Sequence, residues 1–143
     1  MSHSARTSDY EMARVLLVDD DPASRLTLKT VLEAGGYNVD SAATAAEALD
    51  KLDEGKYSLV LSDLQMESPH AGLKVLAHAR MMDYKPATAI ITTYQNSKPG
   101  QARRSGSMLI KPEDLPELLG KVADLIAERA TRRLERQLRL ASA

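Results

Sequence analysis

Three short apolar runs mark the chain: VLLV at 15–18, SLVLS at 58–62 and TAIIT at 88–92. They lack the polar alternation of a strand with one face in water, and their length suits strands that are buried on both faces. Two weaker candidates, YNVDSA at 37–42 and SMLI at 107–110, complete a set of five. The pattern therefore predicts a five-stranded sheet that is covered on both sides.

Helical patterns separate these runs. Asp21 and Pro22 suit the cap and the first residue of one helix, and the glycines at 35–36 suit its end. Thr44 and Glu47 have the spacing of a capping box at the start of a second helix. The apolar stripes are Leu28, Val31 and Leu32 in the first, Ala45, Ala48, Leu49 and Leu52 in the second, and Leu73, Leu76 and Ala77 with Arg80 in a third. Strands that alternate with helices predict a doubly wound parallel α/β sheet.

The last third of the chain is less regular. Pro99 and Gly100 lie where a fourth helix would be under way, so we expect any helix there to be short. A long helical pattern follows, formed by Leu115, Leu118, Leu119, Val122, Leu125, Ile126, Ala130, Leu134 and Leu138. Its first three turns suffice to cover the sheet, and we expect the rest to project beyond it. The expected organisation is a flexible tail at 1–13, a domain at 14–127 and a helical extension at 128–143.

Composition limits the classes of function. A chain of 143 residues with 43% hydrophobic content and a net charge of -1 suits one globular domain, with no global attraction to nucleic acid or membranes. The lack of cysteine excludes disulfides and thiolate metal sites. No apolar run approaches the roughly 20 residues of a membrane span, and the polar start lacks the centre of a signal peptide. We therefore expect a soluble, cytoplasmic protein.

Polar residues that could bind a ligand or take part in a reaction follow the predicted strands. Asp19 and Asp20 follow the first strand, Asp63 ends the third, Thr92 ends the fourth and Lys111 follows the fifth. In an open parallel sheet, ligands bind beyond the carboxyl ends of the strands, where the strand order reverses. If the order is 2-1-3-4-5, strands one and three flank that point, and three carboxylates share one crevice.

Carboxylates packed this closely repel, so such a site either holds a proton or recruits a cation. Oxygen ligands favour a hard cation, and few protein ligands supplemented by water suit Mg²⁺ better than Ca²⁺. Lys111 offers a point charge for phosphate, and the Thr92 hydroxyl can donate a hydrogen bond. Acids, hydroxyl and lysine around a divalent ion predict a phosphoryl-transfer site.

The stretches VLLVDDDP, LVLSDLQM, AIITTY and LIKPED, in this order, resemble the receiver domain of two-component response regulators over about residues 14–127. The resemblance implies a flavodoxin-like fold with strand order 2-1-3-4-5. It also implies a phosphoryl group that moves from a phosphohistidine of a sensor histidine kinase or phosphotransfer protein to an aspartate. Such a domain is a signalling switch, which catalyses only its own phosphorylation and slow dephosphorylation.

By the same resemblance, Asp63 is the phosphoacceptor and contributes to the Mg²⁺ site. Asp20 matches a direct metal ligand, Asp19 matches an acid that acts largely through water, and Gln65 matches the residue whose backbone carbonyl completes the coordination. The hydroxyl that follows the phosphoryl group and the lysine that pairs with it correspond to Thr92 and Lys111.

Two positions depart from the family pattern. Met108 stands where receivers usually carry Tyr or Phe, and Glu67 replaces a common proline after the acceptor. A thioether lacks the rigid two-state packing of a ring. One alternative is therefore a phosphorylation-independent interaction module that keeps the acid pocket. A third interpretation, a small haloacid dehalogenase-like phosphatase, rests on the Asp-x-Asp spacing of Asp19 and Asp21.

The basic run at 129–139 has two interpretations. It is either a solvated helix face with Glu128 and Glu135 as local counter-charges, or the flank of an apolar stripe that packs on a second copy or on a partner. DNA binding is not expected, because no second domain fits in the remaining residues. The preferred reading is a stand-alone receiver that acts through protein–protein interaction with a downstream protein, or as a homodimer through the C-terminal helix.

Overall fold

The sheet has five parallel strands in the order β2-β1-β3-β4-β5. The structure, a computed structural model, describes residues 13–63, 66, 68, 70–91, 108–110 and 116–142. The strands are β1 (Arg14–Val18), β2 (Asn38–Ala42), β3 (Leu59–Asp63), β4 (Ala87–Ile91) and β5 (Met108–Ile110). The helices are α2 (Pro22–Ala34), α3 (Ala45–Glu54), α4 (Ala71–Arg80) and α6 (Leu118–Ser142). The predicted fold class and strand order are confirmed.

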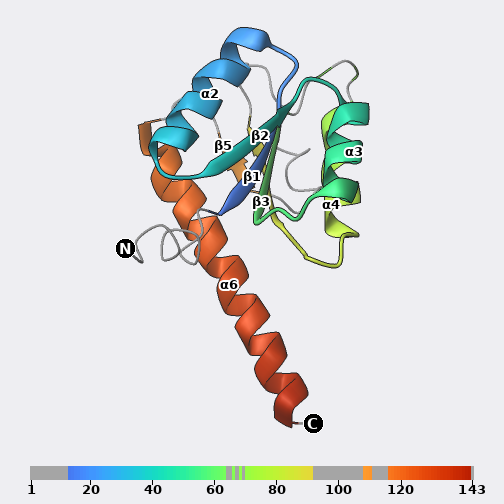
Figure 1. Ribbon diagram of the computed structural model, residues 1–143, viewed down its shortest axis with the longest axis vertical. Coiled ribbons are helices and arrows are strands. Elements are labelled where there is room, and N and C mark those ends of the chain that lie inside the picture. Colours follow the sequence, from blue (N-terminus) through green and yellow to red (C-terminus); the bar gives the residue numbers. More distant parts are fainter. Residues whose placement is uncertain are drawn as a thin grey trace, which may run out of the picture.

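Helices cover both faces of the sheet, with α2 and α6 on one side and α3 and α4 on the other (Figure 1). In β1, Val15 and Leu17 pack with side chains of α2 and α6, whereas Leu16 and Val18 pack with those of α3 and α4. Successive side chains of a strand point to opposite faces, so an unbroken apolar run is needed when both faces are buried. All four residues are at most 1% exposed, which explains why VLLV has no polar alternation.

Local side-chain bonds set the starts of two helices as the sequence predicts. The Asp21 carboxylate accepts a hydrogen bond from the backbone N–H of Ser24, with Pro22 in the first turn of α2. The Thr44 hydroxyl accepts from the backbone N–H of Glu47 at the start of α3. Each bond satisfies a backbone donor that the helix itself leaves unpaired.

The core face of α4 differs from the predicted stripe. Ala77 is exposed and Leu73 is only partly buried, while Val75, Leu76 and Ala79 are fully buried. The buried face also contains Ala71 and Gly72. These small residues allow close packing but contribute little to a hydrophobic pattern. The prediction therefore relied on the larger Leu73, which lies at the edge of the buried face of α4.

The last helix, α6, has 25 residues and extends far past the sheet (Figure 1). Leu118, Val122 and Leu125 belong to the core on the α2 side of the sheet. Beyond Arg129, the described side chains of α6 are exposed from 131 to 141. The predicted extension of the final helix is confirmed. Among the described helices, none combines the length and the apolar composition that crossing a membrane requires.

Two leucines of α2 test this packing. Leu32 is 0% exposed and Leu26 is 67% exposed in the same helix. We expect Leu32→Ala to lower the free energy of unfolding by about 2–5 kcal/mol, because it leaves a cavity in the core. Leu26→Ala, the matched control, should change it by less than about 0.5 kcal/mol. Urea unfolding followed by far-UV circular dichroism measures both, and equal losses would contradict the assigned packing.

Candidate metal centre at the carboxyl edge of the sheet

Parallel pairing of β1 with β3 brings two acids to the same edge of the sheet. Val18 is paired with Ser62, so Asp19 and Asp63 are the next residues on neighbouring strands. The backbone N–H of Asp19 also donates to the carbonyl of Ala42, at 3.1 Å, which ties it to the end of β2. The position of Asp19 is therefore set by the sheet rather than by a free loop.

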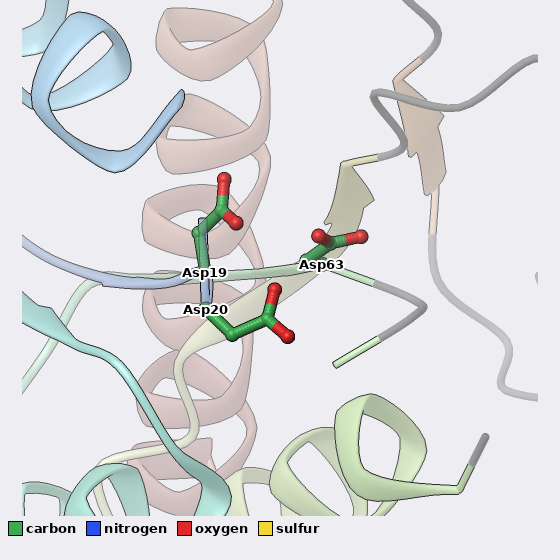
Figure 2. A group of neighbouring side chains, drawn as sticks. All are labelled: Asp19, Asp20 and Asp63. Atoms are coloured by element: carbon green, nitrogen blue, oxygen red, sulfur yellow. The ribbon is translucent and has the colours of Figure 1, made fainter. Parts of the chain in front are cut away.

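Asp19, Asp20 and Asp63 form one acid cluster (Figure 2). One carboxylate oxygen from each lies within 4.8 Å of the others. Asp19 is 1% exposed and Asp63 2% exposed, whereas Asp20 is exposed to solvent. The cluster thus has a buried floor and an open side through which a ligand can approach.

The acid cluster is electrostatically unfavourable by itself. Two charged carboxylates at this separation repel by roughly 3 kcal/mol at an effective dielectric constant of about 20. Asp19 Oδ1 accepts a hydrogen bond from the backbone N–H of Asp21, at 2.9 Å. Asp19 Oδ2 is buried and has no hydrogen-bond partner among the residues that the structure describes. A buried carboxylate oxygen without a donor is costly, so this atom is suited to contact a cation or its water shell.

The donor set fits a hard cation. Its side-chain ligand atoms are all carboxylate oxygens, and a cluster with few protein ligands and one open side leaves room for water and an anionic ligand. Mg²⁺ prefers this combination to a cage made of protein ligands alone. Asp19, Asp20 and Asp63 are therefore the described residues that could hold Mg²⁺.

Asp21, the last of the three consecutive acids, has a different role from Asp19 and Asp20. Its carboxylate caps α2, and the described acid cluster does not include it. The side chain of Arg25 donates to the backbone carbonyl of Asp19, at 2.8 Å, and fixes the turn between the strand and the helix. The Asp-x-Asp reading required Asp19 and Asp21 to act together, and the capping bond gives Asp21 a different task.

Ser62 and Arg25 contribute to the site in ways that the sequence did not reveal. Ser62 is 0% exposed, and its hydroxyl donates to the carbonyl of Asp63 at 3.2 Å and, more weakly, to that of Gly72 at 3.5 Å. It thus connects the end of β3 to the start of α4. Its burial and these two bonds give Ser62 a structural role. The helical position of Arg25, one turn after the acids, was the available signal for its role.

Three of the predicted site residues, Gln65, Thr92 and Lys111, lie outside the described residues, and their roles stay predictions. The strand register bears on two of them. Asp63 is paired with Ile91, and Ile91 with Ile110. Thr92 and Lys111 directly follow these partners in the sequence. The backbone of Met108 lies in β5, opposite Ala89.

Comparisons with known proteins agree with this geometry. The family model of the response regulator receiver domain matches residues 15–123. The transcriptional regulatory protein GlrR of Escherichia coli K12 is 34% identical over 125 residues, which cover 85% of this chain and 28% of GlrR. The transcriptional regulatory protein YkoG of Bacillus subtilis is 29% identical over 126 residues, covering 85% of this chain and 54% of YkoG.

Solved structures show the same fold. The response regulator TrrA from Thermotoga maritima, in complex with Mg²⁺ and BeF, is 32% identical with a TM-score of 0.69, and the match covers 80% of this chain and 99% of TrrA. A CheY-like receiver domain from Methanospirillum hungatei is 27% identical with a TM-score of 0.75, covering 85% of this chain and 99% of that domain.

This chain belongs to the response regulator receiver domain family. Receiver domains are signalling switches of two-component systems rather than metabolic enzymes. The chain spans only 28% of the length of GlrR and 54% of that of YkoG, so the match concerns the receiver part of these regulators.

Titration with Mg²⁺ tests the acid cluster. We expect Asp19→Asn and Asp20→Asn each to weaken Mg²⁺ binding by about tenfold or more, because a charge-assisted contact contributes roughly 1.5–3 kcal/mol. Asp21→Asn removes a neighbouring charge of the same sign while Asn retains the helix cap, and should change the affinity by less than about threefold. Isothermal calorimetry measures all four proteins. Equal losses in the three variants would show a diffuse charge effect instead of a defined site.

Proposed function

We propose that this receiver domain accepts a phosphoryl group on Asp63 from a phosphohistidine, in a Mg²⁺-dependent reaction. The observation that carries the proposal is the acid cluster, in which Asp63 lies at the end of β3 beside Asp19 and Asp20. The TrrA structure supports the choice of ion, because its ligand is Mg²⁺ with beryllofluoride, which resembles a phosphoryl group.

In the proposed transfer, a carboxylate oxygen of Asp63 attacks phosphorus while the bond from phosphorus to the histidine nitrogen breaks. The imidazole leaves, and Asp63 becomes an acyl phosphate. Asp19, Asp20 and the backbone carbonyl of Gln65 would hold Mg²⁺, which when bound supplies neutralisation of the negative charge on the phosphoryl oxygens. The chain's own contribution is to position the acceptor, since phosphoryl transfer depends mainly on positioning and charge compensation.

Two predicted side chains complete the proposal. Lys111 would pair with a phosphoryl oxygen, and the Thr92 hydroxyl would donate a hydrogen bond to another. Phosphorylation adds about two negative charges to this edge of the sheet. The resulting rearrangement of the adjoining segments would alter an outer surface of the domain, and that change is the proposed signal.

The proposed partners follow from this chemistry. The donor is a sensor histidine kinase or a phosphotransfer protein, and the output is a contact with a downstream protein or with a second copy. The extension of α6 offers a surface for that contact, because Leu134 and Leu138 are 56% and 58% exposed there.

Acetyl phosphate tests the acceptor without a kinase. With Mg²⁺ present, we expect intact-protein mass spectrometry to show one added phosphoryl group on the wild type. The adduct should be absent from Asp63→Asn and strongly reduced when EDTA removes the metal ion. Asp53→Asn is the matched control, since Asp53 is exposed and lies in α3 away from the cluster. An equal adduct on Asp63→Asn would reject Asp63 as the acceptor.

A further inference from the structure

Six cationic side chains surround one hollow on the far side of the domain from the acid cluster. The hollow has a volume of about 190 Å³ and is lined by Arg80, Lys85, Pro86, Arg129, Arg132, Arg133 and Arg136. We call these residues the basic hollow. Pro86 immediately precedes β4, whereas Asp63 is paired with the last residue of that strand. The basic hollow and the acid cluster therefore lie at opposite edges of the sheet.

The α6 arginines of the basic hollow share one helix face. Arg129, Arg132, Arg133 and Arg136 are spaced i, i+3, i+4 and i+7, which places them on neighbouring turns of one side. Like charges at these spacings destabilise a helix. Their common direction toward the connection between α4 and β4 is thus electrostatically unfavourable unless negative charge lies between them.

Arg129 forms the floor of the basic hollow. It is only 8% exposed, and its guanidinium donates to the backbone carbonyls of Tyr84, at 2.7 Å, and Lys85, at 2.9 Å. Burial lowers the pKa of Arg129 below its usual value, and the charges of Arg133 and Arg132 lower it further. The two carbonyls orient the guanidinium but carry no net charge, so they do not neutralise it.

Few carboxylates of the described residues lie near these cations. Within the described parts of the chain, the ion pairs found join Arg14 to Asp40 and His78 to Asp53. Asp83 lines an adjacent hollow together with Arg129 and Arg133, and Glu128 lines another together with Arg132. No acidic side chain in the described part of the chain lines the basic hollow itself. Among the residues that the structure describes, six cationic side chains therefore line the basic hollow, against these two acids beside it.

We propose that the basic hollow binds a small phosphate-bearing anion, such as a diphosphate or the polyphosphate group of a nucleotide. Guanidinium groups bind phosphate oxygens through paired N–H donors, and several arginines around one small volume suit an anion that carries more than one charge. A carboxylate would bring a single charge to the same space. This site is separate from the phosphoacceptor and does not depend on it.

The shape of the basic hollow favours a small anion over a nucleic-acid strand. Its arginines converge from the end of α4 and from the side of α6 on a concave site, whereas a nucleic-acid strand needs a long groove that follows its backbone phosphates. The whole chain also has a net charge of -1, so no global field attracts a polyanion. The test must therefore distinguish binding of a small anion from binding of a nucleic-acid strand or an acidic peptide.

Calorimetry with pyrophosphate tests the proposal. We expect binding to the wild type and to Asp63→Asn alike, because Asp63 belongs to the opposite edge of the sheet. Arg132→Gln and Arg136→Gln should each weaken binding by about tenfold or more, the loss of a hydrogen-bonded charge. Arg139→Gln is the matched control, since Arg139 is an exposed arginine of α6 that does not line the hollow. The affinity of Arg139→Gln for pyrophosphate should differ from that of the wild type by less than about threefold.

Titrations with other ligands identify which kind of molecule supplies the anion. Adenosine triphosphate should bind at least as tightly as pyrophosphate, adenosine should not bind, and circular dichroism should show equal helix content in all variants. The proposal is overturned if pyrophosphate does not bind, if Arg139→Gln loses as much affinity as Arg132→Gln, or if binding requires Asp63. Much tighter binding of a single-stranded oligonucleotide or a polyglutamate peptide would also overturn it and assign the surface to that macromolecule.

Discussion

The repulsion between buried carboxylates at the end of β1 and β3 is the constraint around which this domain is arranged. Asp19 and Asp63 are nearly inaccessible to water, and the parallel register leaves neither strand free to move its acid away. A buried charge is tolerable when a counter-charge or donors surround it. A cation at this edge would meet that need, and in the proposed function it would also attract the anionic phosphoryl group to Asp63.

The surrounding structure holds these acids in place. Val15 to Val18 pack against the hydrophobic cores on both faces of the sheet. The Asp21 side chain caps α2, and the Arg25 side chain donates a hydrogen bond to the carbonyl of Asp19. On the other strand, the buried Ser62 hydroxyl connects β3 to α4. Each contact limits the movement of a carboxylate, which is what a reaction that depends on positioning requires.

The two edges of the sheet carry opposite charge. Acids gather where the strands end, and arginines of α6 gather near the start of β4. The net charge of -1 conceals this separation, since it sums 19 Lys and Arg against 20 Asp and Glu over the whole chain. Composition therefore predicted no strong electrostatic partner, whereas the fold creates two local concentrations of charge.

The sequence was sufficient for features that depend on neighbours along the chain. Continuous apolar runs gave the buried strands, and Asp21 and Thr44 marked helix starts because capping acts within three residues. The acid cluster was also predictable, since parallel strands bring their ends to one edge. The core face of α4 was not, because Ala71 and Ala79 are small enough to pack closely yet contribute little to a hydrophobic pattern. The contact of Arg129 with Tyr84 joins residues 45 positions apart, beyond any local spacing rule.

A crystal structure with Mg²⁺ and beryllofluoride tests the central claim most directly, because it locates the metal ion and the phosphoryl analogue together. The account predicts beryllium bonded to a carboxylate oxygen of Asp63, with the metal ion in contact with Asp20 and Asp63. Beryllofluoride bound away from Asp63, or a metal ion held outside the acid cluster, would contradict it.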